Sequence, residues 1–239
     1  FDLNTPLETF TSNLTIDPTL AWGTFYGGNS DDGSQGMATD AAGNVFVCGY
    51  IYSSNLPTLN TGTYWQSHGG GSIDAYILKF DNNGVLLWGT YYGGNNTDNS
   101  YAIATDATGN VFVTGGTEST NFPVTAGVFQ PAKAGFWDAY LLKFDTNGNR
   151  LWATFFGGSG SDWGKALTTD AAGNVFLTGE TLSVTFPVTA GAFQVGHGGS
   201  YDVFIAKFDS NGGQVWATQY GGSSSEKGYG VATDVAGNV

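Results

Sequence analysis

Residues 138–158 read DAYLLKFDTNGNRLWATFFGG, and this stretch decides the fold. The first seven residues are predicted to form a strand. The D-x-N-G segment that follows is predicted to be a turn, because its glycine can adopt a positive φ. The remaining residues, ending in G-G, form a second strand of the hairpin. Closely similar text recurs at residues 74–94 and 202–222, so the hairpin is a repeated unit.

Two further phrases recur in the same register. Trp22, Trp88, Trp152 and Trp216 are spaced by 66, 64 and 64 residues, and each opens a phrase ending in G-G. The phrase T-D-x-x-G-N-V occurs at 39–45, 105–111, 169–175 and 233–239. Internal repeats of this length are typical of solenoids and propellers. Each unit is predicted to hold four short strands, separated by turns rich in Gly, Asn and Asp.

The sequence therefore predicts an all-β protein, a β-propeller built from four-stranded blades of about 65 residues. Three blades are complete, and a partial blade stands at each end. The predicted boundaries are an upstream linker at 1–15 and a repeat array at 16–239, with blades at 33–92, 99–156 and 163–220, an orphan fourth strand at 21–26 and a partial blade at 227–239.

Composition excludes several other classes of protein. Glycine accounts for 38 of 239 residues without a period of three, which excludes collagen. Aromatic residues make up 15%, far too many for a disordered chain. A net charge of -13 argues against a nucleic-acid partner, and no apolar run is long enough for membrane insertion. One cysteine excludes an internal disulfide framework.

The recurring phrases resemble a known family. W-x-T-x-[YF]-G-G, T-D-x-x-G-N-V-[FY]-[VL]-x-G and D-A-[FY]-[IL]-x-K-F-[DN]-x-N-G are similar to the SBBP repeat, a bacterial β-propeller repeat of secreted and cell-surface proteins. The resemblance covers about residues 16–239. It implies a propeller and an extracellular or bacterial cell-surface location, and it implies no enzyme activity, because the family is defined by its repeats.

Residues that recur in every unit are interpreted as architecture. Turn capping and Lys–Asp pairs, within or between blades, are the expected roles of the charged ones, and the tryptophans are expected to cover a hairpin or a seam between blades. These columns are Asp40, Asp106, Asp170 and Asp234; Asp74, Asp138 and Asp202; Asp81, Asp145 and Asp209; Lys79, Lys143 and Lys207; and Trp22, Trp88, Trp152 and Trp216.

No cofactor or metal is expected, with one alternative left open. Asp32, Asp98 and Asp162 form another repeated column, in which Glu226 takes the last place. Hard cations such as Ca²⁺ prefer several carboxylate and carbonyl oxygens, so a ring of calcium sites near these aspartates is the alternative to turn capping. His68 and His197 precede Gly-Gly in two of the long loops, and we expect both to be exposed.

Residues that differ between the units are the candidates for function. The first strand of a propeller blade is the innermost, so variable residues at its start should line the central opening on one face. Aromatic side chains there are good contact residues for sugars and proteins, although packing between blades is an equally open interpretation. The candidate ligand-binding residues are Tyr101, Trp137, Trp163, Lys165 and Tyr229.

The leading functional hypothesis is a non-catalytic extracellular module of a bacterial secreted or cell-surface protein, which serves adhesion, display or the binding of protein or glycan. One rival is a glycan-active hydrolase or lyase. Such an enzyme needs two unique carboxylates, and Glu118 and Glu180, in adjacent columns, are the candidates. The other rival is a structural spacer or filament subunit. The expected partners at the open ends are further blades of the same polypeptide or other protein chains, since bare strand edges invite association.

Overall fold

The structure is a computed structural model that describes residues 20–59, 66–234 and 236–239. All regular elements in these residues are β-strands. No helix long and apolar enough to cross a membrane is found in this part of the chain. The strands are β1 (Asp32–Thr39), β2 (Val45–Ile51), β3 (Asp74–Phe80), β4 (Leu86–Tyr92), β5 (Asp98–Thr105), β6 (Val111–Thr117), β7 (Asp138–Phe144), β8 (Arg150–Phe156), β9 (Asp162–Thr169), β10 (Val175–Thr181), β11 (Asp202–Phe208) and β12 (Gln214–Tyr220).

These strands form three four-stranded antiparallel sheets, and in each sheet the spatial order follows the order along the chain. The fold is therefore all-β, and each sheet is one propeller blade: blade 1 spans 32–92, blade 2 spans 98–156 and blade 3 spans 162–220. Each blade begins one residue before the predicted start and ends at the predicted residue. The predicted linker at 1–15 lies outside the described residues.

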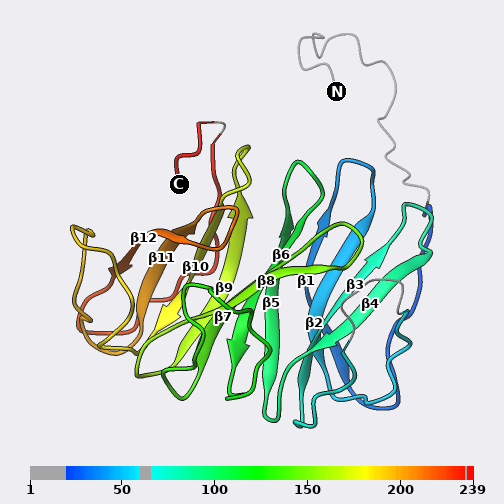
Figure 1. The fold of residues 1–239 in the computed structure, drawn as a ribbon, viewed down its shortest axis with the longest axis horizontal. Helices are drawn as coiled ribbons and strands as arrows, with labels where there is room; N and C mark the ends of the chain where they lie inside the picture. Colours follow the sequence, from blue (N-terminus) through cyan, green and yellow to red (C-terminus); the bar gives the residue numbers. More distant parts are fainter. Residues whose placement is uncertain (1–19, 60–65, 235) are drawn as a thin grey trace, which may run out of the picture.

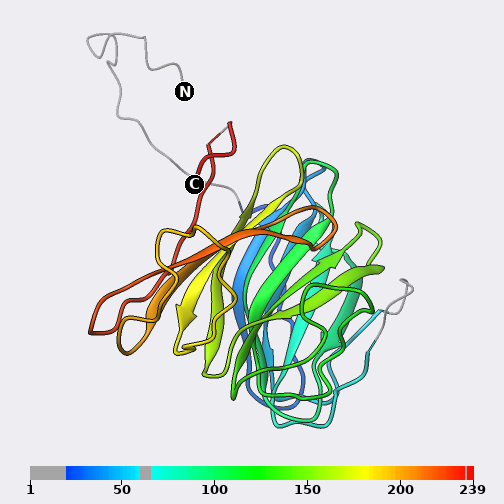
Figure 2. The ribbon, with the colours of Figure 1, turned by 60° about the vertical axis from the view of Figure 1, so that its left-hand side comes forward.

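The three blades pack face to face, with their first strands adjacent (Figure 1). Figure 2 shows the same three sheets after a turn about the vertical axis. A ladder of threonines joins the ends of the first strands. Thr105 Oγ1 donates to the carbonyl of Thr39 at 2.8 Å, and Thr169 Oγ1 donates to the carbonyl of Thr105 at 2.9 Å. The first strands are thus the innermost part of the array.

The turns form where the Asp-rich phrases predict them. The Asp40 carboxylate accepts hydrogen bonds from the backbone N–H groups of Ala42 and Asn44 and from the Asn44 amide. Asp106, Asp170 and Asp234 make the same bonds in their own turns. In the second kind of turn, the Asp81 carboxylate accepts hydrogen bonds from the backbone N–H groups of Asn83 and Val85, on either side of Gly84, whose φ is 80°. These aspartates hold the hairpins.

The hydrophobic core lies at the seams between blades. One cluster joins Phe46, Ile77 and Trp88 of blade 1 to Ile103 and Tyr140 of blade 2, and a second cluster joins blade 2 to blade 3 in the same way. Since both faces of blade 2 are covered, every residue of β7 is buried. In β11 of blade 3, buried and half-buried residues alternate.

Three of the four repeated tryptophans, Trp22, Trp88 and Trp152, lie over the turn glycine of the unit that follows. The Trp88 ring covers Gly148, where an added Cβ would come within 3.0 Å of it, and Trp152 covers Gly212 at 2.9 Å. Trp152 Nε1 also donates to the Ser210 carbonyl at 3.1 Å. Both rings are buried, so the expectation that they cover a seam is confirmed.

The lysine column also connects neighbouring elements. Lys79 Nζ lies 3.9 Å from Asp40 and Lys207 Nζ lies 3.5 Å from Asp170, which confirms the predicted Lys–Asp pairs in two of the three units. Lys79 Nζ also donates to the Thr146 carbonyl of blade 2 at 2.9 Å, and Lys143 Nζ donates to Ser210 of blade 3. Burial lowers the pKa of Lys79 and Lys143, although nearby aspartates oppose this.

The partial units differ from the prediction. Residues 21–26 and 230–234 were expected to be strands, and the structure assigns no strand to either segment. The physical reason is that a strand requires a hydrogen-bonded neighbour, and no strand among the described residues pairs with either segment. The final segment still follows the pattern of a first strand, because Thr233 Oγ1 donates to the Thr169 carbonyl at 3.2 Å.

We predict that Trp152→Ala lowers the free energy of unfolding by about 3–5 kcal/mol, the usual cost of deleting a large buried aromatic side chain. Trp216 is the matched control, because it holds the same position in blade 3, where it is only half-buried. Chemical denaturation of the two variants would measure the difference. Equal losses would contradict a role for the ring in packing against the next blade.

Candidate ligand-binding face

Backbone hydrogen bonds across the seams bring the candidate residues together. The Asp162 N–H donates to the Trp137 carbonyl at 2.8 Å, so Trp163, the next residue of β9, is placed beside Trp137. The two indole rings lie 5.9 Å apart, centre to centre. The Glu226 N–H makes the equivalent bond to the Tyr201 carbonyl at 2.7 Å, which places Lys227 beside Tyr201.

Four of the five predicted residues form one cluster. Lys165 Nζ lies 4.0 Å from the centre of the Tyr101 ring and 5.6 Å from the centre of the Trp163 ring, and Trp163 in turn contacts Trp137. All four side chains are partly accessible to solvent. Tyr229 is 72% exposed, and the described contacts do not join it to the other four.

Three further residues belong to this cluster, which we name the Trp163 cluster: Tyr101, Trp137, Trp163, Lys165, Glu180, Tyr201 and Lys227. Tyr201 packs on Trp163 at 5.7 Å, and Lys227 Nζ lies 5.0 Å from the centre of the Tyr201 ring. A sequence signal for Tyr201 was present, because it holds the same place as Trp137, directly before the aspartate that opens the third strand.

The Glu180 carboxylate is the electrostatic centre of the cluster. It is 5% exposed and forms ion pairs with Lys165 at 3.4 Å and with Lys227 at 3.1 Å. Burial lowers the pKa of Lys165, while Glu180 raises it. The hydrogen bond from Lys227 to Glu180 raises the pKa of that lysine. Two of the seven basic residues of an acidic chain thus meet at one carboxylate.

A glycine makes room for the Trp163 ring. Gly116 of blade 2 occupies the position that Glu180 holds in blade 3, and an added Cβ on Gly116 would overlap Trp163 Cδ1. The combination of Gly116 with Trp163 is not repeated in the other units. The cluster is therefore a feature added to the repeating frame, with flat apolar faces beside two ammonium groups and a carboxylate.

The enzyme alternative gains no support from the positions of its two acids. Glu180 is held in ion pairs by two lysines. Glu118 lies directly after β6, where its backbone N–H bonds the Thr97 carbonyl at 2.9 Å. The described contacts do not join the two carboxyl groups across a common space, and the assignment as a glycan-active enzyme stays an untested hypothesis.

The aspartate column that suggested calcium lies in the seams. Asp98 accepts hydrogen bonds from the Gly94 N–H at 2.7 Å and from Ser119 Oγ at 2.8 Å. Asp32 accepts the equivalent bonds from the Gly28 N–H and Ser53 Oγ. Asp162 accepts them from the Gly158 N–H and Ser183 Oγ. Among the described residues, no group of three or more His, Cys, Asp or Glu side chains could hold a metal ion. The expectation of no bound metal and the calcium alternative at these aspartates both stay untested.

Gly93 and Gly157, the first glycines of two of the G-G pairs, each separate two carboxyl groups. A Cβ on Gly93 would come within 2.5 Å of Asp74 Oδ1 and 2.6 Å of Asp98 Oδ2, so no larger residue fits. The pKa of Asp98 is raised to about 7, mainly by burial and to a smaller extent by the charge of Asp74. Burial likewise raises the pKa of Asp162 to about 6.

The two histidines lie beside the aspartates that open the third strands of blades 1 and 3. The expectation that these histidines are exposed was wrong. Their side chains are only 15% and 8% exposed. Each loop folds back on the aspartate that opens the third strand, so His68 Nδ1 lies 3.5 Å from Asp74 and His197 Nδ1 lies 3.4 Å from Asp202.

We predict that stability decreases as the pH rises from about 4 to about 7, because aspartate in an unfolded chain has a pKa near 3.9 and folded Asp98 has a pKa of about 7. The folded protein then binds more protons than the unfolded chain within this window. Urea denaturation across a pH series should show a smaller decrease for Asp98→Asn. Asp81→Asn, at a half-buried turn residue whose pKa is lowered, is the control. An unchanged slope in Asp98→Asn would refute the assignment.

Comparison with known proteins agrees with the fold. The family model of the SBBP β-propeller repeat matches residues 87–123 and 151–186, which confirms the resemblance over those two segments. An uncharacterized WD repeat-containing protein, L264, of Acanthamoeba polyphaga mimivirus is 23% identical over 252 residues. The match covers 93% of this chain and 18% of that relative, so the chain spans less than a fifth of its length.

Among solved structures, a protein of unknown function from Bacteroides caccae is similar at 12% identity, with a TM-score of 0.25. The similarity covers 80% of this chain and 83% of that one. A TM-score this low carries no argument about either fold or function.

Proposed function

We propose that this chain is a non-catalytic binding module of an extracellular or bacterial cell-surface protein, and that it holds glycan on the Trp163 cluster. The observation that carries the proposal is the row of Trp137, Trp163 and Tyr201, whose rings follow one another at 5.9 and 5.7 Å. Flat aromatic faces bind the apolar faces of sugar rings, and the polar groups beside them bind hydroxyls.

The distribution of the cluster among the repeats supports a role beyond architecture. The residues that hold the blades together recur in each unit. Trp163, Lys165 and Glu180, in contrast, each occur once in their respective columns. A frame that assembles without these residues elsewhere in the array does not require them for folding.

The proposed location is supported by composition and by the resemblance to the SBBP repeat. The chain carries few charged residues, at 11%, and has one cysteine, Cys48, which is fully buried. Burial raises the pKa of that thiol to about 12, so it is an unreactive core residue. Such a chain relies on aromatic packing for stability and has no exposed thiol to be oxidised outside the cell.

The test is a glycan array probed with the intact protein, followed by titration of the best glycan. We predict that Trp163→Ala weakens binding about 30-fold, the effect of a loss of ~2 kcal/mol at a central contact. Gly116→Ala should weaken it as well, because the added methyl group displaces the Trp163 ring. Tyr52→Ala, which removes an exposed aromatic ring of blade 1, is the matched control and should bind normally.

Two results would overturn the proposal. One is an array on which the folded protein binds no glycan. The other is a glycan whose affinity is the same for the wild-type protein and for Trp163→Ala. Binding of a protein in place of glycan by the same residues would retain the site and reject its proposed ligand class.

A further inference from the structure

The accessible part of the Trp163 cluster is positively charged. The Glu180 side chain is only 7% exposed, whereas the side chains of its two partners, Lys165 and Lys227, are 20% and 40% exposed. Lys165 pairs with one carboxylate oxygen, Oε1, at 3.4 Å, and Lys227 pairs with the other, Oε2, at 3.1 Å. One carboxylate balances only one of the two ammonium groups, so an unbalanced positive charge remains on side chains that solvent reaches.

Neighbouring groups do not cancel this charge. Among the described residues, Glu180 is the carboxylate with which either lysine forms an ion pair. The other side chains that act most strongly on Lys227 are Tyr201 and Tyr229, and tyrosine hydroxyls are neutral at pH 7. The group that acts on Lys165 besides Glu180 is Lys227 itself. The excess charge therefore belongs to the cluster as it stands.

The chain uses its other basic residues elsewhere. It has seven basic residues and a net charge of -13, so positive charge is scarce. The remaining five serve the frame or bind backbone carbonyls in loops: Lys79, Lys143 and Lys207 in the lysine column, Lys133 on the carbonyls of Gly135 and Phe136, and Arg150 on the carbonyl of Pro123. The two lysines that lie outside this set both meet at Glu180.

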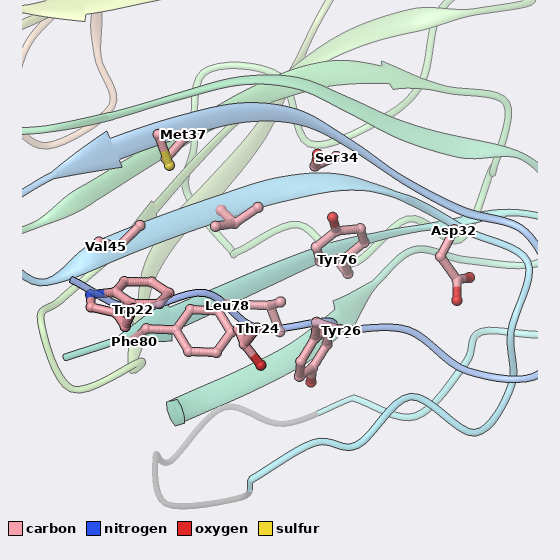
Figure 3. A pocket seen from close by; sticks show the side chains of 11 residues that line it. Trp22, Thr24, Tyr26, Asp32, Ser34, Met37, Val45, Tyr76, Leu78 and Phe80 are labelled. Atoms are coloured by element: carbon pink, nitrogen blue, oxygen red, sulfur yellow. The ribbon is translucent and has the colours of Figure 1, made fainter. Parts of the chain in front are cut away.

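Aromatic groups in this chain are not generally accompanied by positive charge. Figure 3 shows Trp22, Tyr26 and Phe80 close together beside a cavity of about 330 Å³, with the Phe80 ring centre 6.2 Å from that of Trp22 and 5.9 Å from that of Tyr26. Among the described residues that line this cavity, the one charged side chain is the carboxylate of Asp32. The ammonium groups are thus a particular property of the Trp163 cluster.

Both ammonium groups are held along the aromatic row. Lys165 Nζ lies 5.6 Å from the centre of the Trp163 ring, and Lys227 Nζ lies 5.0 Å from the centre of the Tyr201 ring. The ion pairs with Glu180 restrict the rotamers that a free lysine would sample. A ligand that lies on these rings therefore has a positioned ammonium group near each of them, and little side-chain entropy is lost when it binds.

We infer that the glycan held by the Trp163 cluster carries an anionic group, a carboxylate or a sulfate, that pairs with Lys165 and Lys227; this inference rests on the proposed function. An anion replaces the water on the excess ammonium with a charge-assisted hydrogen bond, which a neutral sugar does not offer. The acidity of the rest of the chain opposes this only weakly, because exposed charges are screened beyond ~8 Å at physiological ionic strength.

The test begins with an array of uronic-acid, sulfated and neutral oligosaccharides, probed with the intact protein. The acidic glycan that binds best is then titrated beside its neutralised counterpart, in which the carboxylate is reduced to a hydroxymethyl group or the sulfate is removed. We expect the neutralised glycan to bind about tenfold or more weakly, because a hydrogen bond to a charged group is the stronger kind. The two treatments distinguish a carboxylate from a sulfate.

Variants of Lys227 connect this preference to the cluster. Lys227→Met should lower the ratio of the acidic to the neutralised affinity by about tenfold, because one ammonium group is lost. Lys227→Arg keeps the charge and should restore most of the ratio. Lys207→Met is the matched control, because it removes one positive charge from the frame, where Lys207 pairs with Asp170. Its ratio should equal that of the wild-type protein.

The possible failures are distinguishable. Equal affinities for the acidic and the neutralised glycan, both reduced in Trp163→Ala, would overturn the inference and retain the proposed function. An unchanged ratio in Lys227→Met would overturn the inference as well. A folded protein that binds no glycan on the array would overturn the proposed function itself, and the inference with it.

Discussion

The contact of each fourth-strand tryptophan with the turn glycine of the next blade is the constraint on which the array depends. A sheet has two faces, and a four-stranded antiparallel sheet of this size cannot bury both by itself. Trp88 contacts Gly148 across the seam. The lack of a Cβ on Gly148 leaves room for the ring over the turn, and its φ of 85° allows the chain to make that turn. The glycine thus serves the turn of one blade and the core of the seam at the same time.

At the other end of the seam the same chain tolerates a less favourable arrangement. Two carboxyl groups from adjacent blades, Asp74 and Asp98, flank Gly93 in a buried place. Part of the cost of burying these carboxyl groups is offset by backbone N–H groups, a serine hydroxyl and a histidine. The part of this cost that is not offset favours the protonated carboxyl groups, so the pKa values of Asp74 and Asp98 are raised. Asp98 fixes the G-G turn through the Gly94 N–H, and Asp74 fixes the long loop through the Gly69 N–H.

The sequence alone predicted the frame well, because a repeat displays the same structural requirement several times. The strands, the turns, the tryptophan seams and two of three Lys–Asp pairs all followed from columns of identical residues. The site was harder. Variable columns pointed to Trp163, Lys165 and Tyr101, but the roles of Glu180 and Tyr201 depend on which residues of neighbouring blades meet across a seam. The buried histidines were misjudged for the same reason, since the path of a long loop is not written in its local sequence.

Lys227 connects the repeating frame of the blades to the Trp163 cluster. It belongs to the unit after blade 3, yet its ammonium group lies 3.1 Å from Glu180 of blade 3. The Glu226–Tyr201 backbone bond that places Lys227 is a seam bond of the same kind that places Trp163 beside Trp137. The Trp163 cluster is therefore composed at two successive seams, not within any one blade. Its geometry depends on the order of the units, so a variation confined to a few columns creates a distinct surface while each seam keeps the same core.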